Sequence, residues 1–317
     1  MKILDTTIEK GKTYNLSMNI AKLHTRSNLN IPVIVSRSKK DGSILLLNGG
    51  VHGDELNGVE IVRRLIQEGH HNPKVGTIIC IPVLNIFGYL NHSRKFPDGR
   101  DLNRMFPGSK NGSLASQVAY QFRTEIIPHI DIMIDFHTGG AKRVNAPQIR
   151  CAKEDTKALE LAEIFGAPYV VYSKVIQKSM RDMVRKKGKT VLLYEGGKSQ
   201  CFEEDIIQYG FNGALRVMHS LGMTSENPDG SPEGVLVLKS TWIRAAFSGM
   251  FHLRIKNGAK VEKGQPLGFI SDPYGDFSRK VKSPIDGYIF CVNSAPIVNK
   301  GDALFHISKE SRAIKYR

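Results

Sequence analysis

The sequence predicts an α/β fold, with a mixed, centrally parallel sheet flanked by helices and a small all-β barrel or sandwich domain at the C-terminal end. Three observations predict it. Apolar runs alternate with amphipathic segments between residues 43 and 221, as in βαβ units. A polar Gly/Pro/Ser stretch at residues 222–234 is typical of a linker, and only short β-type runs follow it. We therefore expect one domain over residues 1–225 and another over residues 235–317.

The first domain is expected to begin with strands. Residues 12–36 alternate between polar and apolar side chains and contain a β-branched run, which predicts two or three strands. The apolar run at residues 44–47 ends at Asn48-Gly49-Gly50, and it predicts a strand, a glycine turn and then a helix over residues 56–68. Another apolar run, at residues 76–83, predicts a buried strand.

The segment from Asn85 to Ser109 is rich in Asn, Arg, Gly and Pro and shows little periodicity. A loop of that length in a compact domain is usually functional or disordered, and its content favours function. Beyond it, a predicted helix precedes a strand that ends directly before His137. The later elements follow the same alternation: helices over residues 116–127, 158–165, 179–187 and 203–221, and strands over residues 130–136, 169–172 and 190–194.

Polar side chains follow four of the predicted strands. His52 and Glu55 come after the first, the segment 94–104 after the second, His137 after the third and Glu195 after the fourth. In open α/β sheets, ligands bind outside the carboxyl ends of the strands, so we expect these side chains to meet at one edge. His52 and Glu55 are three residues apart and are expected on one face of the first helical turn. Singly, each could be a solvated or structural residue, but their joint placement favours a site.

The residue types at this edge suit a zinc ion. Catalytic zinc sites have three nitrogen, oxygen or sulfur ligands from the protein and one position left for water. We expect one zinc ion per chain held by His52, Glu55 and His137, with Glu195 left unligated. Nitrogen and oxygen ligands also accept other divalent ions, so the metal loaded in the cell stays open. The remaining histidines are interpreted as structural or surface residues.

Composition narrows the class of protein. The formal net charge of +15 could indicate a polyanion, but the chain has no dense basic arm or basic stripe with interleaved aromatics, so we expect no nucleic-acid partner. The longest apolar stretch, residues 75–90, is broken by Pro82, Asn85 and Gly88, and we expect no membrane association. The N-terminal residues contain no secretory signal, and the four cysteines form no CxxC pair. A cytoplasmic protein is expected.

Four ordered motifs carry a resemblance to a known family. They are GGVHGDE, SRKFPDGRDLNRMFPG, DFHTGG and LLYEGG, within residues 44–221. This stretch resembles the succinylglutamate desuccinylase/aspartoacylase family, relatives of the zinc carboxypeptidases. The resemblance implies a carboxypeptidase-like domain that hydrolyses the amide bond of an N-acyl amino acid or a similar small molecule. It also implies that Glu195 is the catalytic carboxylate and that His52, Glu55 and His137 are the metal ligands.

The resemblance also assigns roles within the long loop. Asn103 and Arg104 match the pair that holds the substrate carboxylate, and a guanidinium suits a carboxylate bidentately. Arg94 matches the arginine that faces the developing oxyanion, with Arg100 as its competitor. From the chemistry of zinc sites, we expect Asp101 to accept the second ring N–H of His52 and fix its tautomer. A loop-capping role for Asp101 stays open.

The C-terminal segment contains a weak internal repeat, with residues 248–270 echoed by residues 283–307. This repeat resembles the biotinyl/lipoyl carrier domains. Those carriers present a modified lysine in a Met-Lys context, whereas here Lys280 stands in SDPYGDFSRKV, so we expect no covalent cofactor. Two roles stay open: packing over or near the active site, which would narrow it against long peptides, or a contact within a homo-oligomer.

The leading hypothesis is a zinc-dependent amidohydrolase, a deacylase acting on a small anionic N-acyl amino acid with Glu195 as general base. One alternative is a metallocarboxypeptidase acting on short peptides. Another is a non-catalytic binding module in which the carrier-like domain is the active part. The acyl group and the amino acid stay open at this stage.

Overall fold

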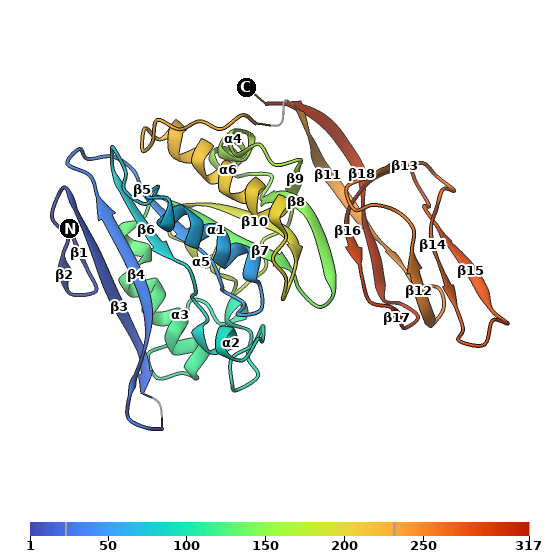
Figure 1. Ribbon diagram of the computed structural model, residues 1–317, viewed down its shortest axis with the longest axis horizontal. Helices are drawn as coiled ribbons and strands as arrows, with labels where there is room; N and C mark the ends of the chain where they lie inside the picture. The colour runs from blue at the N-terminus through green and yellow to red at the C-terminus, as the bar shows by residue number, and fades with distance from the viewer. Residues whose placement is uncertain (23, 231–232, 317) are drawn as a thin grey trace.

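The computed structural model describes residues 1–22, 24–230 and 233–316 and is a mixed α/β fold, as the sequence predicts (Figure 1). Within these residues a twelve-stranded sheet runs in the order β13-β16-β18-β11-β9-β8-β10-β7-β5-β6-β4-β3. Its central strands are parallel to one another. They are β6 (Thr77–Ile81), β5 (Ile44–Asn48), β7 (Ile132–Gly139) and β10 (Thr190–Lys198).

Helices cover both faces of the central strands (Figure 1). Leu45 and Leu47 of β5 pack in one core and Leu46 in the other, as the two-residue period of a strand requires. The first core also contains α1 (Leu56–Gln67), α4 (Thr156–Phe165) and α6 (Glu204–Ser220). The second contains α3 (Leu114–Glu125) and α5 (Met180–Lys186). With both faces covered by helices, the carboxyl ends of these parallel strands are where loops can build a site.

The N-terminal strands extend the sheet in the antiparallel sense. β3 (Lys12–Lys22) pairs with β4 (Asn28–Arg37), which pairs with β6. A two-stranded hairpin, β1 (Lys2–Ile3) with β2 (Thr6–Thr7), precedes them. The long predicted loop after β6 contains two short helices, α2 (Ile86–Leu90) and a 3-10 turn (Leu102–Arg104). A further 3-10 turn (Ile127–His129) follows α3.

Five strands form a closed ring that the sequence did not predict. β16 pairs with β18 on one side and with β8 on the other, which closes the circuit through β11 and β9. The ring surrounds a small core that includes Tyr169, Val237 and Phe290. Its strands are β8 (Arg143–Cys151), β9 (Tyr169–Tyr172), β11 (Glu233–Arg244), β16 (Gly287–Asn293) and β18 (Ala303–Lys315). Two strands from the middle of the chain and three from its C-terminal segment therefore share one hydrogen-bonded ring.

The rest of the C-terminal segment is also β structure. A separate four-stranded sheet has the order β15-β14-β12-β17, and the short strand β13 (Lys260–Val261) pairs with β16. The four strands are β12 (Gly249–Leu253), β14 (Pro266–Ser271), β15 (Ser278–Lys282) and β17 (Ile297–Val298). Residues 231–232 of the predicted linker lie outside the described residues. Among the described helices, none combines the length and apolar character needed to cross a membrane.

Candidate active site

His52 and Glu55 lie in the tight turn between β5 and α1, not on a helical turn as the sequence suggested. The helix begins at Leu56, with Glu55 as its N-terminal cap residue, and the Glu55 N–H donates to the His52 carbonyl at 3.2 Å. The turn is tight because Gly53 passes directly against Gly88, where a Cβ would lie 1.9 Å from the Gly88 carbonyl carbon. This close approach holds both side chains at the carboxyl end of β5.

His137 and Glu195 lie inside their strands and not after them. β7 continues to Gly139 and β10 to Lys198, because both strands keep neighbours to pair with past the predicted ends. In the β7–β10 pair, Glu195 is the direct partner of His137. His137 and Glu195 line one cavity together with His52 and Glu55, although the predicted strand ends were wrong by several residues.

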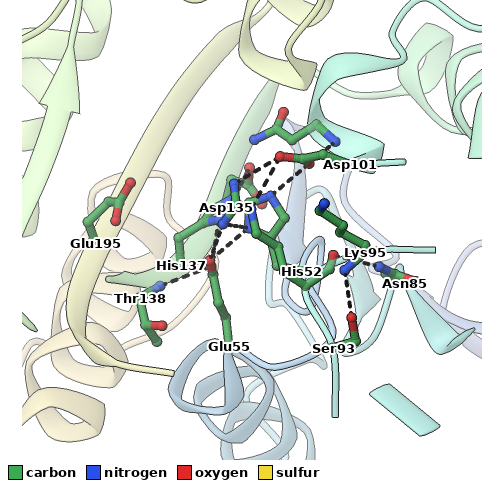
Figure 2. Close-up of polar contacts among 12 residues, drawn as sticks. His52, Glu55, Asn85, Ser93, Lys95, Asp101, Asp135, His137, Thr138 and Glu195 are labelled. Atoms are coloured by element: carbon green, nitrogen blue, oxygen red, sulfur yellow. Dashed lines mark hydrogen bonds and ion pairs between the residues drawn. The ribbon is translucent and has the colours of Figure 1, made fainter. Parts of the chain in front are cut away.

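Glu55 lies between the two imidazoles (Figure 2). Its Oε1 is 2.7 Å from Nδ1 of His52, and its Oε2 is 2.8 Å from Nδ1 of His137. The Thr138 N–H donates to the same Oε2 at 3.1 Å. All three side chains are buried, and they offer ligand atoms that lie within 4.8 Å of one another, so the group could hold a metal ion.

A second carboxylate lies behind each imidazole. Nε2 of His52 is 3.2 Å from Asp101 Oδ1, and Nε2 of His137 is 2.9 Å from Asp135 Oδ2. Asp135 is itself held by Asn48, whose Nδ2 donates to Oδ1 at 2.8 Å. Each ring therefore has Nε2 toward an aspartate and Nδ1 toward Glu55. Asp101 thus makes the contact expected from the sequence, and it also caps the 3-10 turn by accepting from the Asn103 N–H.

The charges of this group reinforce one another. Burial disfavours ionised Glu55, yet His52 and His137 hold the pKa of its carboxyl well below the ordinary value. Burial also disfavours charge on the imidazoles, but Glu55 and Asp101 raise the pKa of His52. Asp135 and Glu55 raise the pKa of His137 well above its ordinary value. The group therefore favours positive charge among its nitrogens.

Arg94 borders the same group. Its Nη1 donates to Glu55 Oε1 at 3.0 Å, and its Nε and Nη2 donate to Asp101 Oδ2 at 3.2 and 3.1 Å. Gly140 leaves room for this guanidinium, since a Cβ there would lie 2.9 Å from Nη1. Arg100, the competitor for this role, instead pairs with Asp98 at 2.9 Å and is exposed. The structure therefore brings Arg94, and not Arg100, to the site.

Asn103 and Arg104 line the same cavity as the His52–Glu55–His137 group, a space of about 410 Å³. Asn103 Oδ1 accepts from the Met180 N–H at 2.8 Å, which ties the long loop to the start of α5. Arg104 Nη1 donates to the Asn103 carbonyl at 2.7 Å, and its side chain is exposed. The pair is thus held at the wall of the cavity by backbone contacts.

Glu195 lines the cavity to one side of this group (Figure 2). Its Oε2 accepts from Asn145 Nδ2 at 2.7 Å, and its Oε1 lies 3.9 Å from Arg150 Nη1. Several lining residues were not predicted from the sequence because they come from β8, the segment between β9 and α5, α5 itself and the C-terminal segment, which carry none of the four motifs. They are Arg143, Asn145, Arg150, Lys174, Arg181, Trp242 and Cys291.

The missed residues make much of the wall cationic. Arg181 is only 7% exposed, and its guanidinium donates to the Arg150 carbonyl, the Ser173 hydroxyl and the Lys174 carbonyl, all neutral acceptors. Burial, together with Arg150 and Arg185, lowers the pKa of Arg181 to about 10. The cavity therefore combines an acid-lined His/Glu centre with a cationic wall.

The chain is an α/β protein with a buried His–Glu–His group that could hold a metal ion and a further carboxylate, Glu195, in the same cavity. Residues 41–221, more than half of the chain, match the succinylglutamate desuccinylase/aspartoacylase catalytic domain. The chain belongs to this family, and the resemblance seen in its motifs is confirmed.

Similar proteins include a curated deacetylase and several solved structures. The N-alpha-acetyl-L-2,4-diaminobutyric acid deacetylase of Halomonas elongata is 26% identical over 306 residues, covering 88% of this chain and 85% of the relative. A succinylglutamate desuccinylase/aspartoacylase from Rhodobacter sphaeroides has a TM-score of 0.84 at 24% identity and covers all of both chains. The product-bound ectoine utilization protein of Ruegeria pomeroyi has a TM-score of 0.81 at 22% identity, covering 95% of this chain and 97% of the other. These two structures support the fold.

Proposed function

We propose that this protein is a zinc-dependent amidohydrolase that removes the acyl group from a small, anionic N-acyl amino acid. The observation that carries the proposal is the convergence of His52, Glu55 and His137 in a cavity that also contains Glu195. Membership of a family with deacylases supports it, as does the deacetylase activity named for the Halomonas relative.

The donor set fits a divalent cation. Nε2 of each ring faces Asp101 or Asp135, and Nδ1 of each ring faces an oxygen of Glu55. A proton on each Nδ1, or one metal ion between the three side chains, would stabilise these contacts. Two imidazole nitrogens and a carboxylate oxygen are the ligands found in catalytic zinc sites. We propose that these three residues hold one zinc ion per chain.

Zinc bound there would supply acidification of water and polarisation of the scissile carbonyl. Glu195 would accept a proton from the attacking water and deliver it to the leaving nitrogen. The water oxygen becomes bonded to the carbonyl carbon, the C–N bond breaks, and an acid and an amine are released. Arg94 Nη1, which borders Glu55 and His52, would donate to the oxyanion.

The cationic wall supports an anionic substrate. We propose that Asn103 and Arg104 bind the carboxylate of the amino acid, as the motif resemblance implies. Arg181 supports the same conclusion, because its buried charge faces neutral acceptors and would be stabilised by an anion in the cavity. Trp242 and Cys291 line the cavity from the C-terminal segment, so we also propose that this segment limits the size of the substrate.

We propose a cytoplasmic location and two domains, over residues 1–225 and 235–317, with a small C-terminal barrel or sandwich. The four cysteines are free, and three are buried, which suits a reducing compartment. The linker composition supports the division, while the closed ring of β8, β9, β11, β16 and β18 supports close contact between the two parts.

The test measures hydrolysis by the zinc-loaded protein of a panel of N-acetyl and N-succinyl amino acids, with dipeptides as the alternative substrates. Glu195→Gln should retain zinc and lower kcat by about 10²- to 10⁴-fold. Glu204→Gln, at the start of α6 and paired with Arg64, is the matched control and should behave as the wild type. A zinc-free protein, or undiminished activity in Glu195→Gln, would overturn the proposal.

A further inference from the structure

Asn145 is the closest hydrogen-bond partner of Glu195. It is 3% exposed, and its Nδ2 donates to Glu195 Oε2 at 2.7 Å. The other carboxylate oxygen, Oε1, lies 3.9 Å from Arg150 Nη1, beyond hydrogen-bond distance. The two oxygens of Glu195 are therefore inequivalent: among the described residues, a buried amide donates to Oε2, whereas Oε1 has a cation 3.9 Å away.

Asn145 occupies a junction in the sheet. In β8 it is the direct partner of Gly197 in β10 and of Cys291 in β16. The β8–β10 register shifts between Glu195 and Gly197, which changes the direction of the side chains that follow. This irregularity places Asn145 beside the Glu195 carboxylate, although Gln148 is the direct strand partner of Glu195.

We propose, on the basis of the hydrolase function proposed above, that Asn145 is a positioning residue that holds Oε2 of Glu195. Oε1 is then the oxygen that accepts the proton of the attacking water and delivers it to the leaving nitrogen. Fixing one oxygen removes rotation of the carboxylate about its terminal bond. The free oxygen then keeps one orientation toward the cavity, and a fixed base makes proton transfer more efficient than a rotating one.

A neutral amide suits this role better than a charged group. A lysine or arginine at 2.7 Å would form an ion pair and make the Glu195 carboxylate a weaker base, and an aspartate or glutamate carboxylate would place a second negative charge beside it. A primary amide donates one hydrogen bond without adding net charge. The buried position of Asn145 also excludes water that would otherwise solvate Oε2.

The C-terminal segment holds Asn145 in place. β16 pairs with β8 from residue 143 to residue 145, and Asn257 Nδ2 donates to the Val144 carbonyl at 3.0 Å. Ser294 adds backbone and hydroxyl contacts to the Lys142 carbonyl, both at 2.8 Å. The C-terminal segment thus contributes to the geometry of Glu195 without touching it, a role distinct from lining the cavity.

The first test compares Asn145→Ala with Asn91→Ala in the full-length, zinc-loaded protein. Asn145→Ala should lower kcat by about 10- to 100-fold with little change in KM or zinc content, the range typical of outer partners of a catalytic group. Asn91→Ala also removes an amide hydrogen bond, from Nδ2 to the Phe87 carbonyl at 2.8 Å, but it lies outside the cavity and leaves Glu195 Oε2 bonded. Its kcat should stay within about twofold of the wild type, and equal effects in both variants would overturn the inference.

The second test does not depend on activity. In protein with ¹³C-labelled glutamate carboxyls, assigned with Glu195→Gln, the Asn145→Ala change should shift the Glu195 carboxyl resonance, because the hydrogen bond to Oε2 is lost. Asn145→Asp is close in shape, replaces the amide donor by a carboxylate, and should shift the same resonance if the alanine variant does not fold. An unchanged Glu195 resonance in the folded variants would overturn the inference. If the wild type hydrolysed no substrate, the proposed function would fail while this spectrum still decided the role of Asn145.

Discussion

Two groups of histidines in this molecule have opposite electrostatic environments. His52 and His137 lie among carboxylates, which raise the pKa of both imidazoles despite their burial. His306 lies in the closed ring, stacked on Trp242 with centroids 4.2 Å apart and against Phe290 at 4.4 Å. Burial, with Arg150 and Arg143 nearby, lowers the pKa of His306 to about 3. Within one protein, the surroundings of His52 and His137 therefore favour a charged imidazole, whereas those of His306 favour a neutral one.

The difference shows that burial alone does not set the state of an imidazole. Burial lowers the pKa in both regions, and the sign of the neighbouring charge decides the result. The acids are concentrated at Glu55, Asp101 and Asp135, where a cation would be stabilised, and the arginines lie on the wall where an anion would be. The net charge of +15 describes the chain, whereas the cavity has two regions of opposite sign.

The largest effect is expected from removing the carboxylate of Glu55, which lies between the two imidazoles. Glu55→Gln leaves two imidazole nitrogens facing a neutral amide, so the group should lose its affinity for zinc. Since a metal ion contributes several kcal/mol to stabilising the transition state, hydrolysis should fall by roughly 10³-fold or more. Metal analysis after gel filtration, together with kcat/KM, measures both effects.

Glu60→Gln is a matched control for this change. Glu60 lies one turn into α1, and its carboxylate pairs with Arg63 and Arg64 at 2.6 and 2.8 Å, away from the cavity. This variant should keep its zinc and its activity. Full zinc occupancy in Glu55→Gln would show that the central carboxylate is dispensable and that the acid-rich region has another role.

A smaller effect is expected from the carboxylate behind His137. Asp135→Asn keeps the shape but removes the charge that fixes the Nε2 proton, so zinc affinity should fall by about 10- to 100-fold. Competition with a chromophoric chelator measures the affinity. Asp131→Asn, at a surface position that accepts from the Ile44 N–H, should leave the affinity unchanged. If the two variants bound zinc equally, the contact between Asp135 and His137 would be structural only.

The sequence predicted the centre of the fold because its signals are local. Each apolar run forms a strand with its own periodicity, and the carboxyl ends of parallel strands meet at one edge. His52, Glu55, His137 and Glu195 could therefore be brought together without coordinates. Their exact backbone setting could not, since the extension of β7 and β10 depends on neighbouring strands and not on the residues themselves.

The closed ring was not predicted because the contacts that form it are not local in the sequence. Its closing contact joins β8 to β16 across more than a hundred residues, and β8 contains Pro147 and two arginines in place of a clean alternation. Asn145 accordingly had no motif, no charge and no periodic position to mark it. Long-range pairing of this kind is set by packing and closure, which single-sequence patterns do not encode.

The smallest predicted effect concerns His306, the histidine whose pKa is lowered, and it is measured as the pH dependence of stability. Because its pKa is lowered in the fold, from an ordinary value of 6.5 to about 3, the unfolded chain binds a proton there more readily than the folded protein. The neutral His306 therefore costs no stability above about pH 6.5. As the pH falls from 6.5 toward 3, the unfolding free energy decreases, by about 2 kcal/mol at pH 5.

His306→Phe preserves stacking and cannot titrate, so its unfolding free energy should fall less between pH 7 and pH 5. His252→Phe is the matched control for replacing a stacked histidine, since His252 stacks on Phe269 at the same 9° angle. Urea unfolding at both pH values measures the slopes, and equal slopes for His306→Phe and the wild type would show that burial and the neighbouring arginines do not lower the pKa of His306 in the fold.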